Sequence, residues 1–112
     1  MTDLDPQDAK LVTLARASMA RVGAKEGAAV RDADGRSYAA GPVNLPSLQI
    51  GALELAVAQA AAAGATGLEA APVVNVVEDA IVHLTIVRAL GGEGLPVFIA
   101  NGQGEVVQVL TS

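Results

Sequence analysis

The first third of the chain changes from a helical to a strand-like spacing of its apolar positions. Apolar and small side chains recur every three or four residues over positions 11–22, which is the spacing of one helix face. Asp5-Pro6 precedes them and is a typical helix start, because aspartate caps free backbone N–H groups and proline fits the first turn. Residues 27–31 and 36–40 then flank Asp34-Gly35, a dipeptide typical of tight turns between antiparallel strands. We therefore predict a helix followed by a β-hairpin.

The remaining positions alternate between helix-like and strand-like patterns. Residues 44–46 are predicted to form a connector, and Ser47 to cap an alanine-rich helix that ends near Gly64. Pro72 lies within an apolar strand pattern, where its missing N–H favours a sheet edge or a bulge. The further predicted elements are a strand over residues 68–77, a helix over 78–90 ended by the glycines at 91–94, and strands over 95–100 and 105–110.

This order of elements, α-β-β-α-β-α-β-β, predicts an α/β fold in which helices cover both faces of a mixed sheet of five strands, giving three layers. A length of 112 residues fits one domain, residues 1–112. Much of the 52% hydrophobic content is Ala and Val, and the aromatic residues are Tyr38 and Phe98. Each small side chain buries little apolar area. We therefore expect copies of the chain to associate and so to bury additional apolar surface.

Charge and composition exclude several classes of partner. A net charge of -5 disfavours nucleic acid, because affinity for phosphates comes largely from Lys and Arg, and two aromatic residues give no platform for stacked bases. The uncharged run over residues 55–68 is too short to span a membrane, so no membrane partner is expected. Residues 1–8 are acidic, unlike a signal peptide, and the chain has no cysteine. We expect a cytoplasmic protein.

Several short stretches resemble the small, single-domain cytidine deaminases in their order and spacing. Gly27-Ala28-Ala29-Val30 is similar to a strand of that family, and Asp34-Gly35 followed by Tyr38 is similar to the turn after it. Residues 96–105 are similar to the closing hairpin of the family, with its Pro-Val start and its Asn-X-X-Gly-Glu end. The resemblance spans about residues 11–110 and implies the cytidine deaminase fold, a zinc-dependent activity and a small homo-oligomer.

The resemblance also implies where a zinc site would lie, and the side chains there depart from the family pattern. The Cys-Ala-Glu motif of the family falls on Leu53-Glu54-Leu55, and its Pro-Cys-X-X-Cys motif on residues 79–83. The ligand positions therefore hold Leu53, Ala80 and His83, and the acid/base position holds Leu55, or Glu54 if the register moves by one residue. Catalytic zinc normally takes three protein ligands and a water, which one imidazole cannot replace. His83 and Glu54 are thus expected to be ordinary residues of their helices.

Two further sets of residues complete the predicted sites. The positions that hold the sugar in the family fall on Pro42 and Asn44, which we interpret as remnants of a substrate pocket. Ala56, Ala60 and Ala63 form a stripe at i, i+4 and i+7 on the alanine-rich helix, where small side chains let another helix approach closely. We predict that this stripe is the contact of a homo-dimer or homo-tetramer.

Three functions stay open at this point. The favoured hypothesis is a non-catalytic protein with the cytidine deaminase fold, a structural or regulatory interaction module that needs no cofactor and binds copies of itself or an unknown protein. The first alternative is a hydrolase of the family, which would need zinc at an unrecognised site. The second is a nucleoside-binding protein that kept the pocket and lost the reaction. Zinc content and cytidine turnover would distinguish these functions.

Overall fold

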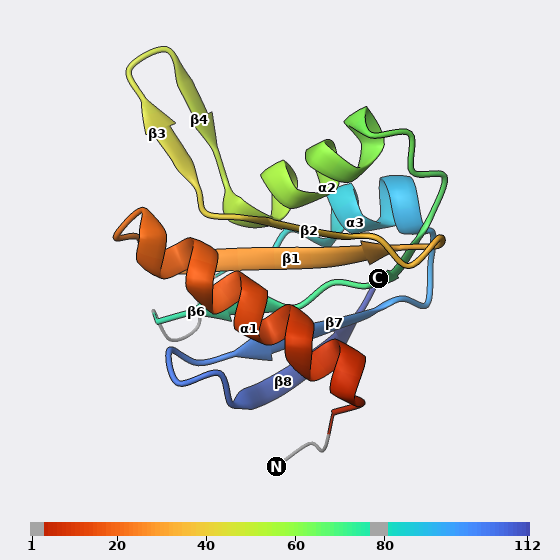
Figure 1. Ribbon diagram of the computed structural model, residues 1–112. Helices are drawn as coiled ribbons and strands as arrows, with labels where there is room; N and C mark the ends of the chain where they lie inside the picture. The colour runs from red at the N-terminus through yellow and green to blue at the C-terminus, as the bar shows by residue number, and fades with distance from the viewer. Residues whose placement is uncertain (1–3, 77–80) are drawn as a thin grey trace.

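The computed structural model describes residues 4–76 and 81–112 of the chain as three layers around one main sheet (Figure 1). Helix α1 (Pro6–Arg21) covers one face of the sheet, and α2 (Ala52–Ala62) and α3 (Leu84–Gly91) lie on the other. The predicted α/β fold with three helices and helices on both faces is confirmed. None of the described helices is long and apolar enough to cross a membrane.

The first helix forms as its sequence predicts. The Asp5 side chain accepts a hydrogen bond from the backbone N–H of Gln7 at 2.8 Å, and Pro6 is the first helical residue. This arrangement satisfies one of the free N–H groups at the helix start, and proline has no N–H to leave unpaired. Leu11, Val12 and Ala15 are buried, and they fix the face of α1 that packs on the sheet.

The main sheet is mixed, as predicted. Its strands β7 and β6 run parallel, whereas the other neighbours are antiparallel. In spatial order they are β2 (Ser37–Ala40), β1 (Glu26–Asp32), β6 (Val73–Asn75), β7 (Pro96–Ala100) and β8 (Val106–Thr111), with β5 (Leu68–Ala70) beside β1 off this path. The predicted hairpins β1–β2 and β7–β8 are both present.

The sheet has six strands rather than the predicted five, because the single strand expected over residues 68–77 is divided into β5 and β6. Ala71 and Pro72 separate the two strands, and both pair with β1. Pro72 cannot donate a hydrogen bond, but its carbonyl oxygen accepts one from the N–H of Ala29 at 3.0 Å. The proline thus interrupts an interior strand and does not mark a sheet edge. Residue 77 lies outside the described residues.

A hairpin replaces the predicted connector and helix start. Residues 44–46 and the predicted cap Ser47 belong to β3 (Val43–Leu45), β4 (Leu48–Ile50) and the turn between these strands. The α2 helix begins at Ala52 after Gly51, which gives no side-chain cap. The prediction was wrong because apolar residues alternate with Asn44 and Gln49 here, which is the period of a strand and not of a helix.

The third helix is shorter than predicted. It begins at Leu84, and residues 81–83 are not helical. The N-terminal part of the prediction, residues 78–80, lies outside the described residues. The helix ends as predicted at the glycines, where Gly92 takes a φ of 76°, a backbone conformation that other residues rarely adopt.

Small side chains make up much of the core, and this overturns the predicted oligomer stripe. Ala56 and Ala60 have no exposed surface within the single chain, because they pack with strand residues such as Ala28 and Val30. Ala63, the third member of the stripe, is exposed. Alanines let α2 lie close to its own sheet, so the small side chains serve a contact within the chain and not the predicted contact between subunits.

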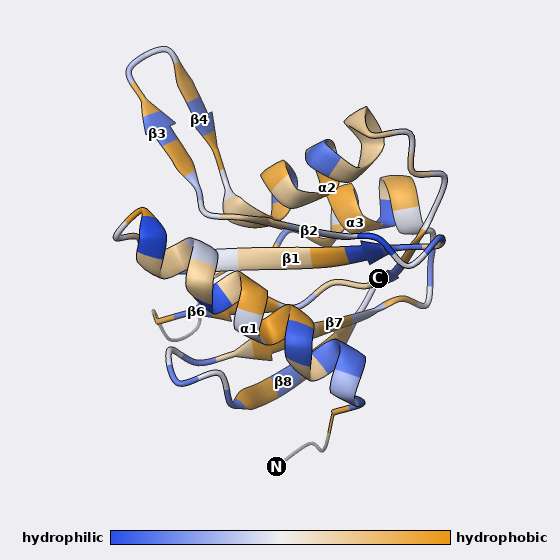
Figure 2. Ribbon diagram, in the orientation of Figure 1, coloured by the Kyte–Doolittle hydropathy of each residue, from blue (hydrophilic) through white to orange (hydrophobic). Residues whose placement is uncertain are grey.

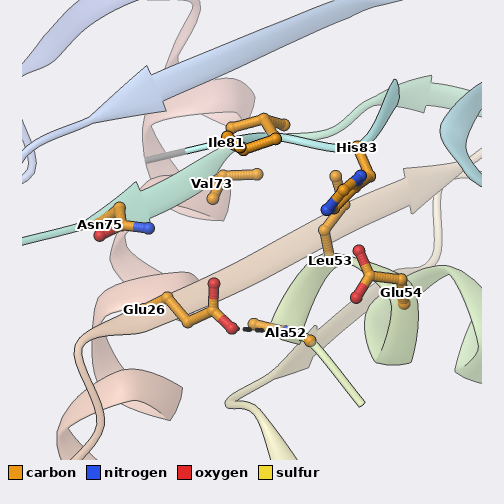
Figure 3. A pocket seen from close by; sticks show the side chains of 10 residues that line it. Glu26, Ala52, Leu53, Glu54, Val73, Asn75, Ile81 and His83 are labelled. Atoms are coloured by element: carbon orange, nitrogen blue, oxygen red, sulfur yellow. Dashed lines mark hydrogen bonds between the residues drawn. The ribbon is translucent and has the colours of Figure 1, made fainter. Parts of the chain in front are cut away.

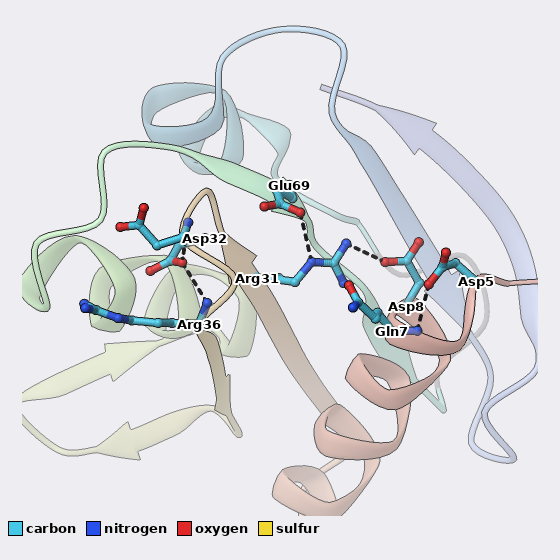
Figure 4. Close-up of polar contacts among 8 residues, drawn as sticks. Asp5, Gln7, Asp8, Arg31, Asp32, Arg36 and Glu69 are labelled. Carbon is cyan, nitrogen blue, oxygen red and sulfur yellow. Dashed lines mark hydrogen bonds and ion pairs between the residues drawn. The ribbon is translucent and has the colours of Figure 1, made fainter.

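Arg31 on β1 forms ion pairs that connect the start of α1 to the sheet (Figure 4). The Nη2 of Arg31 lies 2.9 Å from Oδ1 of Asp8, and its Nε donates to Oε2 of Glu69 at 3.2 Å. The Arg31 and Asp8 side chains are largely shielded from solvent, so screening by water and salt weakens this pair less than an exposed one.

The turn between β1 and β2 is organised by Asp32, a carboxylate that is 1% exposed. It accepts hydrogen bonds from the backbone N–H groups of Asp34 at 3.0 Å and Arg36 at 2.9 Å, and from the Tyr38 hydroxyl at 3.1 Å. Burial by itself would raise the pKa of Asp32, but the hydrogen bonds from Arg36, Tyr38 and Asp34 together lower it below its usual value.

We expect that Asp32→Asn lowers the melting temperature by several degrees at neutral pH. A carboxylate whose folded pKa is depressed stabilises the fold above its unfolded pKa of about 3.9, and this contribution disappears as the pH falls through the lower folded value. The difference in melting temperature between the wild type and Asp32→Asn should therefore become smaller below about pH 4. Thermal unfolding from neutral to acid pH measures it, with the exposed Asp34→Asn as control. A difference that stays constant with pH would contradict this explanation.

Candidate functional site

A cavity of about 220 Å³ lies at one end of the main sheet, where the start of α2 meets the start of β1, the end of β6 and the segment before α3 (Figure 3). The elements that form it are far apart in sequence and join through the sheet order and the packing of α2. The residues that line it are Glu26, Gly51, Ala52, Leu53, Glu54, Val73, Asn75, Ile81, Val82 and His83.

Glu26 connects two walls of the cavity. It is the first residue of β1, and its Oε1 accepts a hydrogen bond from the backbone N–H of Ala52 at 3.2 Å (Figure 3). Ala52 is the first residue of α2, whose N-cap Gly51 has no side chain for this purpose. A carboxylate at this place satisfies a free N–H and interacts favourably with the positive end of the helix dipole. Glu26 therefore replaces the missing cap of α2.

Glu54 lies in the first turn of α2 and folds back toward the helix start. A Cβ atom placed on Gly51 would overlap Oε2 of Glu54, so glycine leaves the space that this carboxylate occupies. Glu54 is partly buried and lines the cavity, as does Glu26. An acidic side chain in the first turn again complements the helix dipole. Both carboxylates thus have a structural explanation at the start of α2.

The structure brings together two of the predicted metal positions. Leu53 lines the cavity with 5% of its surface exposed, and it also belongs to the core beneath α2. His83 lines the cavity from the residue before α3 and is exposed, whereas the sequence predicted that it lies within a helix. Ala80, the third position, lies outside the described residues. Leu55, the predicted acid/base position, packs against the core and does not line the cavity.

The side chains at the cavity do not fit a zinc site of cysteine and histidine ligands. The sequence contains no cysteine and one histidine. Within residues 4–76 and 81–112, no three side chains of His, Asp or Glu lie close enough together to hold a metal ion. Leu53 has no lone pair to offer a metal. We therefore derive no chemical step through zinc for this cavity.

The predicted pocket remnants do not line the cavity. Asn44 is exposed on the β3–β4 hairpin and Pro42 precedes that hairpin, so a role of these two residues in a substrate pocket stays a prediction. The sequence analysis in turn missed Glu26 and Asn75, which lie at the ends of two neighbouring strands. The one local signal was a charged residue directly before the apolar run of β1.

The cavity offers mainly hydrogen-bond acceptors. The carboxylates of Glu26 and Glu54 accept and do not donate when they are ionised, and the amide of Asn75 can do both. Such walls suit a small ligand with N–H or O–H donors. The zinc deaminases, by comparison, combine a metal-bound hydroxide with a glutamate for hydrolytic deamination.

The comparisons with known proteins extend over nearly the whole chain. A family model described as cytidine deaminase-like matches residues 4–104. Among solved structures, the chain is similar to cytidine deaminase from Burkholderia pseudomallei, with 27% sequence identity and a TM-score of 0.75 over 91% of this chain and 90% of that chain. A search of curated proteins finds no match. The matched region contains β1, α2 and β6, the elements that carry most of the cavity.

Proposed function

Because the chain belongs to the cytidine deaminase-like family, we propose that it is a non-catalytic member which acts as a structural or regulatory interaction module. The observation that supports this proposal is the position of Leu53. It occupies the first turn of α2 at the wall of the cavity, where the resemblance places a zinc-binding cysteine. An aliphatic side chain there cannot bind a metal and also contributes to the core.

The roles of the two carboxylates support the same proposal. A general acid/base must be able to exchange protons with a substrate, within hydrogen-bond reach of it. Glu26 instead accepts the N–H of Ala52, and Glu54 folds over Gly51 at the helix start. Their structural use at the start of α2 accounts for both side chains without a reaction.

The partners that we propose are protein partners: further copies of this chain, or an unknown second protein. A net charge of -5 opposes binding to nucleic acid. An interaction role needs an exposed apolar surface, which the chain has outside the cavity, at Leu45 and Leu48 among others.

A second candidate function is nucleoside binding without turnover. The observation that favours it is the cavity itself, which is present in this chain and has polar walls at Glu26, Glu54 and Asn75. The third candidate, a hydrolase of the family, would need zinc and is the least supported by the donor set around Leu53 and His83.

We expect purified protein to contain well below one equivalent of zinc per chain. It should form no uridine from cytidine and no deoxyuridine from deoxycytidine above the buffer blank. The reason is that no described group of side chains can hold the metal that would activate water. Elemental analysis after dialysis against a weak chelator measures the zinc, and chromatography of the reaction mixture measures uridine. An active cytidine deaminase, purified in the same way, is the control that retains metal and turns over.

Each result selects one of the three functions. Uridine formation by the unmodified protein would establish the hydrolase and end the non-catalytic proposal. Near-stoichiometric zinc that survives dialysis would contradict the non-catalytic proposal and revive the hydrolase alternative. Calorimetric titration with cytidine and uridine separates the other two functions. Saturable binding without turnover would favour the nucleoside-binding protein, and an absence of both binding and turnover is the result that we expect.

A further inference from the structure

The turn between β7 and β8 consists of residues 101–105, and its hydrophilic sequence contrasts with the mainly apolar strands on either side (Figure 2). Its first two residues are Asn101 and Gly102. When glycine follows asparagine, the backbone nitrogen of the glycine can approach the side-chain amide, because glycine has no Cβ to hinder it. The other two asparagines of the chain, Asn44 and Asn75, each precede a bulky aliphatic residue.

Asn101 holds the turn together through its side chain and its backbone. Its Oδ1 accepts hydrogen bonds from the backbone N–H groups of Gln103 and Glu105, each at 3.0 Å. Its backbone N–H donates to the carbonyl oxygen of Glu105, and its carbonyl oxygen accepts from the N–H of Gly104, both at 2.9 Å. The side-chain amide of Asn101 is therefore held against the backbone of the turn.

The two N–H groups on Oδ1 lie where an attack on the amide would place negative charge. When a nucleophile adds to the Cγ of Asn101, the double bond to Oδ1 opens and leaves an oxyanion on that atom. Enzymes of acyl transfer stabilise such an oxyanion with preorganised N–H donors, and each donor is worth a factor of about 10²–10³ in rate. The hydrogen bonds that order the turn thus also polarise the amide for attack.

The nucleophile next to this amide is the backbone nitrogen of Gly102. In the described part of the chain, the N–H of Gly102 donates to no acceptor. The glycine of the β1–β2 turn differs, because the N–H of Gly35 donates to the carbonyl oxygen of Asp32 at 3.1 Å. A hydrogen bond of that kind holds the proton that must leave when the nitrogen attacks. The Gly102 nitrogen is free of this restraint.

We propose that Asn101 is a modification site at which the folded chain deamidates without an enzyme. The nitrogen of Gly102 releases its proton and bonds to Cγ of Asn101, the bond from Cγ to Nδ2 breaks, and the departing nitrogen takes up a proton and leaves as ammonia. The resulting cyclic succinimide consumes one water molecule, which opens the ring at either carbonyl. One opening gives aspartate, and the other gives isoaspartate, in which the main chain runs through the side-chain carbonyl.

The two products affect the turn differently. Aspartate at residue 101 keeps an oxygen that accepts the N–H groups of Gln103 and Glu105, and its charge strengthens both hydrogen bonds. Isoaspartate adds a CH₂ group to the main chain and so disrupts the pairing of residue 101 with Glu105. The turn also approaches the end of β6, because a Cβ placed on Gly102 would lie 2.9 Å from Cγ1 of Val76. Isoaspartate is therefore expected to loosen the β7–β8 hairpin beside a strand that lines the cavity.

The rate of amide loss at each asparagine of the intact protein tests the proposal. Purified protein is incubated at about pH 7 and about pH 9, then digested in acid, which stops the reaction, and its peptides are analysed by mass spectrometry. We expect Asn101 to be converted at least about tenfold faster than Asn44 or Asn75, with aspartate and isoaspartate as separate products. The rate should rise several-fold with pH, because the attacking nitrogen must lose its proton.

A peptide with the sequence of residues 97–105 separates the effect of the fold from that of the sequence. It contains the same dipeptide without the fixed turn, so the folded chain should react at least as fast as the peptide. Asn101→Gln is the matched variant, because it keeps an amide at this position but must close a larger ring. Its conversion should be at least about tenfold slower than that of the wild type.

The thermal stability of the products gives a second measurement. Asn101→Asp carries one product from the start and should melt close to the wild type, because the hydrogen bonds to Oδ1 remain. Wild-type protein that has accumulated isoaspartate should melt at a lower temperature than Asn101→Asp. Equal melting temperatures would contradict the expected loosening of the hairpin.

Three results would overturn the modification site itself. An Asn101 that stays intact in the folded chain while the peptide reacts would show that the turn protects the amide. Equal rates at Asn101 and Asn44 would show that the donors on Oδ1 do not promote the attack. A wild-type rate of amide loss in Asn101→Gln would place the modification at another residue.

Discussion

Replacing Ala60 with arginine is expected to unfold the chain. Ala60 has no exposed surface and packs in the core between α2 and the main sheet. An arginine there must either force α2 from the sheet or bury an unpaired guanidinium, and each costs several kcal/mol. We expect a loss of more than about 4 kcal/mol of unfolding free energy. The free energy of unfolding of a native protein is usually about 5–15 kcal/mol. The substitution therefore removes a large part of the stability, and little folded protein should remain.

The exposed neighbour Ala61→Arg is the matched control for that variant. It introduces the same side chain on the same helix at a solvent-exposed position. Its free energy of unfolding should lie within about 0.5 kcal/mol of the wild-type value. Urea unfolding followed by circular dichroism compares the two. If Ala60→Arg remained folded and lost an oligomer instead, the alanine stripe would be a subunit contact after all, contrary to its burial in the single chain.

Replacing Gly27 with alanine should destabilise the protein by about 1–3 kcal/mol or more, although alanine adds one methyl group. Gly27 lies on β1 directly beneath α1. A Cβ atom there would overlap the backbone carbonyl oxygen of Ala15 and would lie 2.9 Å from Cβ of Met19. Backbone atoms cannot rotate away as the end of a long side chain can, so α1 must move from the sheet and lose contacts of Leu11 and Val12.

Gly67→Ala is the control for this second variant. A Cβ atom at Gly67 would meet Cβ of Ala33 at 3.7 Å, which is an ordinary contact, and its φ is not among the positive values. This substitution should be neutral or slightly stabilising, because alanine restricts the unfolded chain. Thermal and urea unfolding of both variants give the comparison. Equal stabilities of Gly27→Ala and Gly67→Ala would show that α1 does not approach β1 as closely as described.

The local elements were predictable where a few neighbouring residues determine the conformation. Asp5-Pro6 began α1 because a capping side chain and a fixed proline φ act within one helical turn. Asp34-Gly35 formed the first turn, in which Gly35 takes a φ of 85°. The resemblance of short stretches to a family was confirmed, because several of them kept the order and spacing of a whole fold.

The alanine-rich helix was predicted well in type and poorly in orientation. Alanine gives a helix face little hydrophobic contrast, so the sequence could not show whether Ala56 and Ala60 face a sheet or a partner. The position of the β1 and β2 strands beneath α2 decided that they belong to the core. The β3–β4 hairpin was missed for a related reason, since an amphipathic run of four apolar residues fits a strand or a short helix until its pairing partner is known.

The sequence by itself determined the order of the helices and most strands, the resemblance of the fold, and the absence of cysteine ligands for a metal. The tertiary structure alone decided which residues share the cavity. Glu26 and Ala52 are 26 positions apart, and their hydrogen bond exists because α2 packs across the start of β1. Local propensities act over a few residues, whereas a cavity is formed by chain segments that meet through packing, so only the folded chain places Glu26, Leu53, Asn75 and His83 around one space.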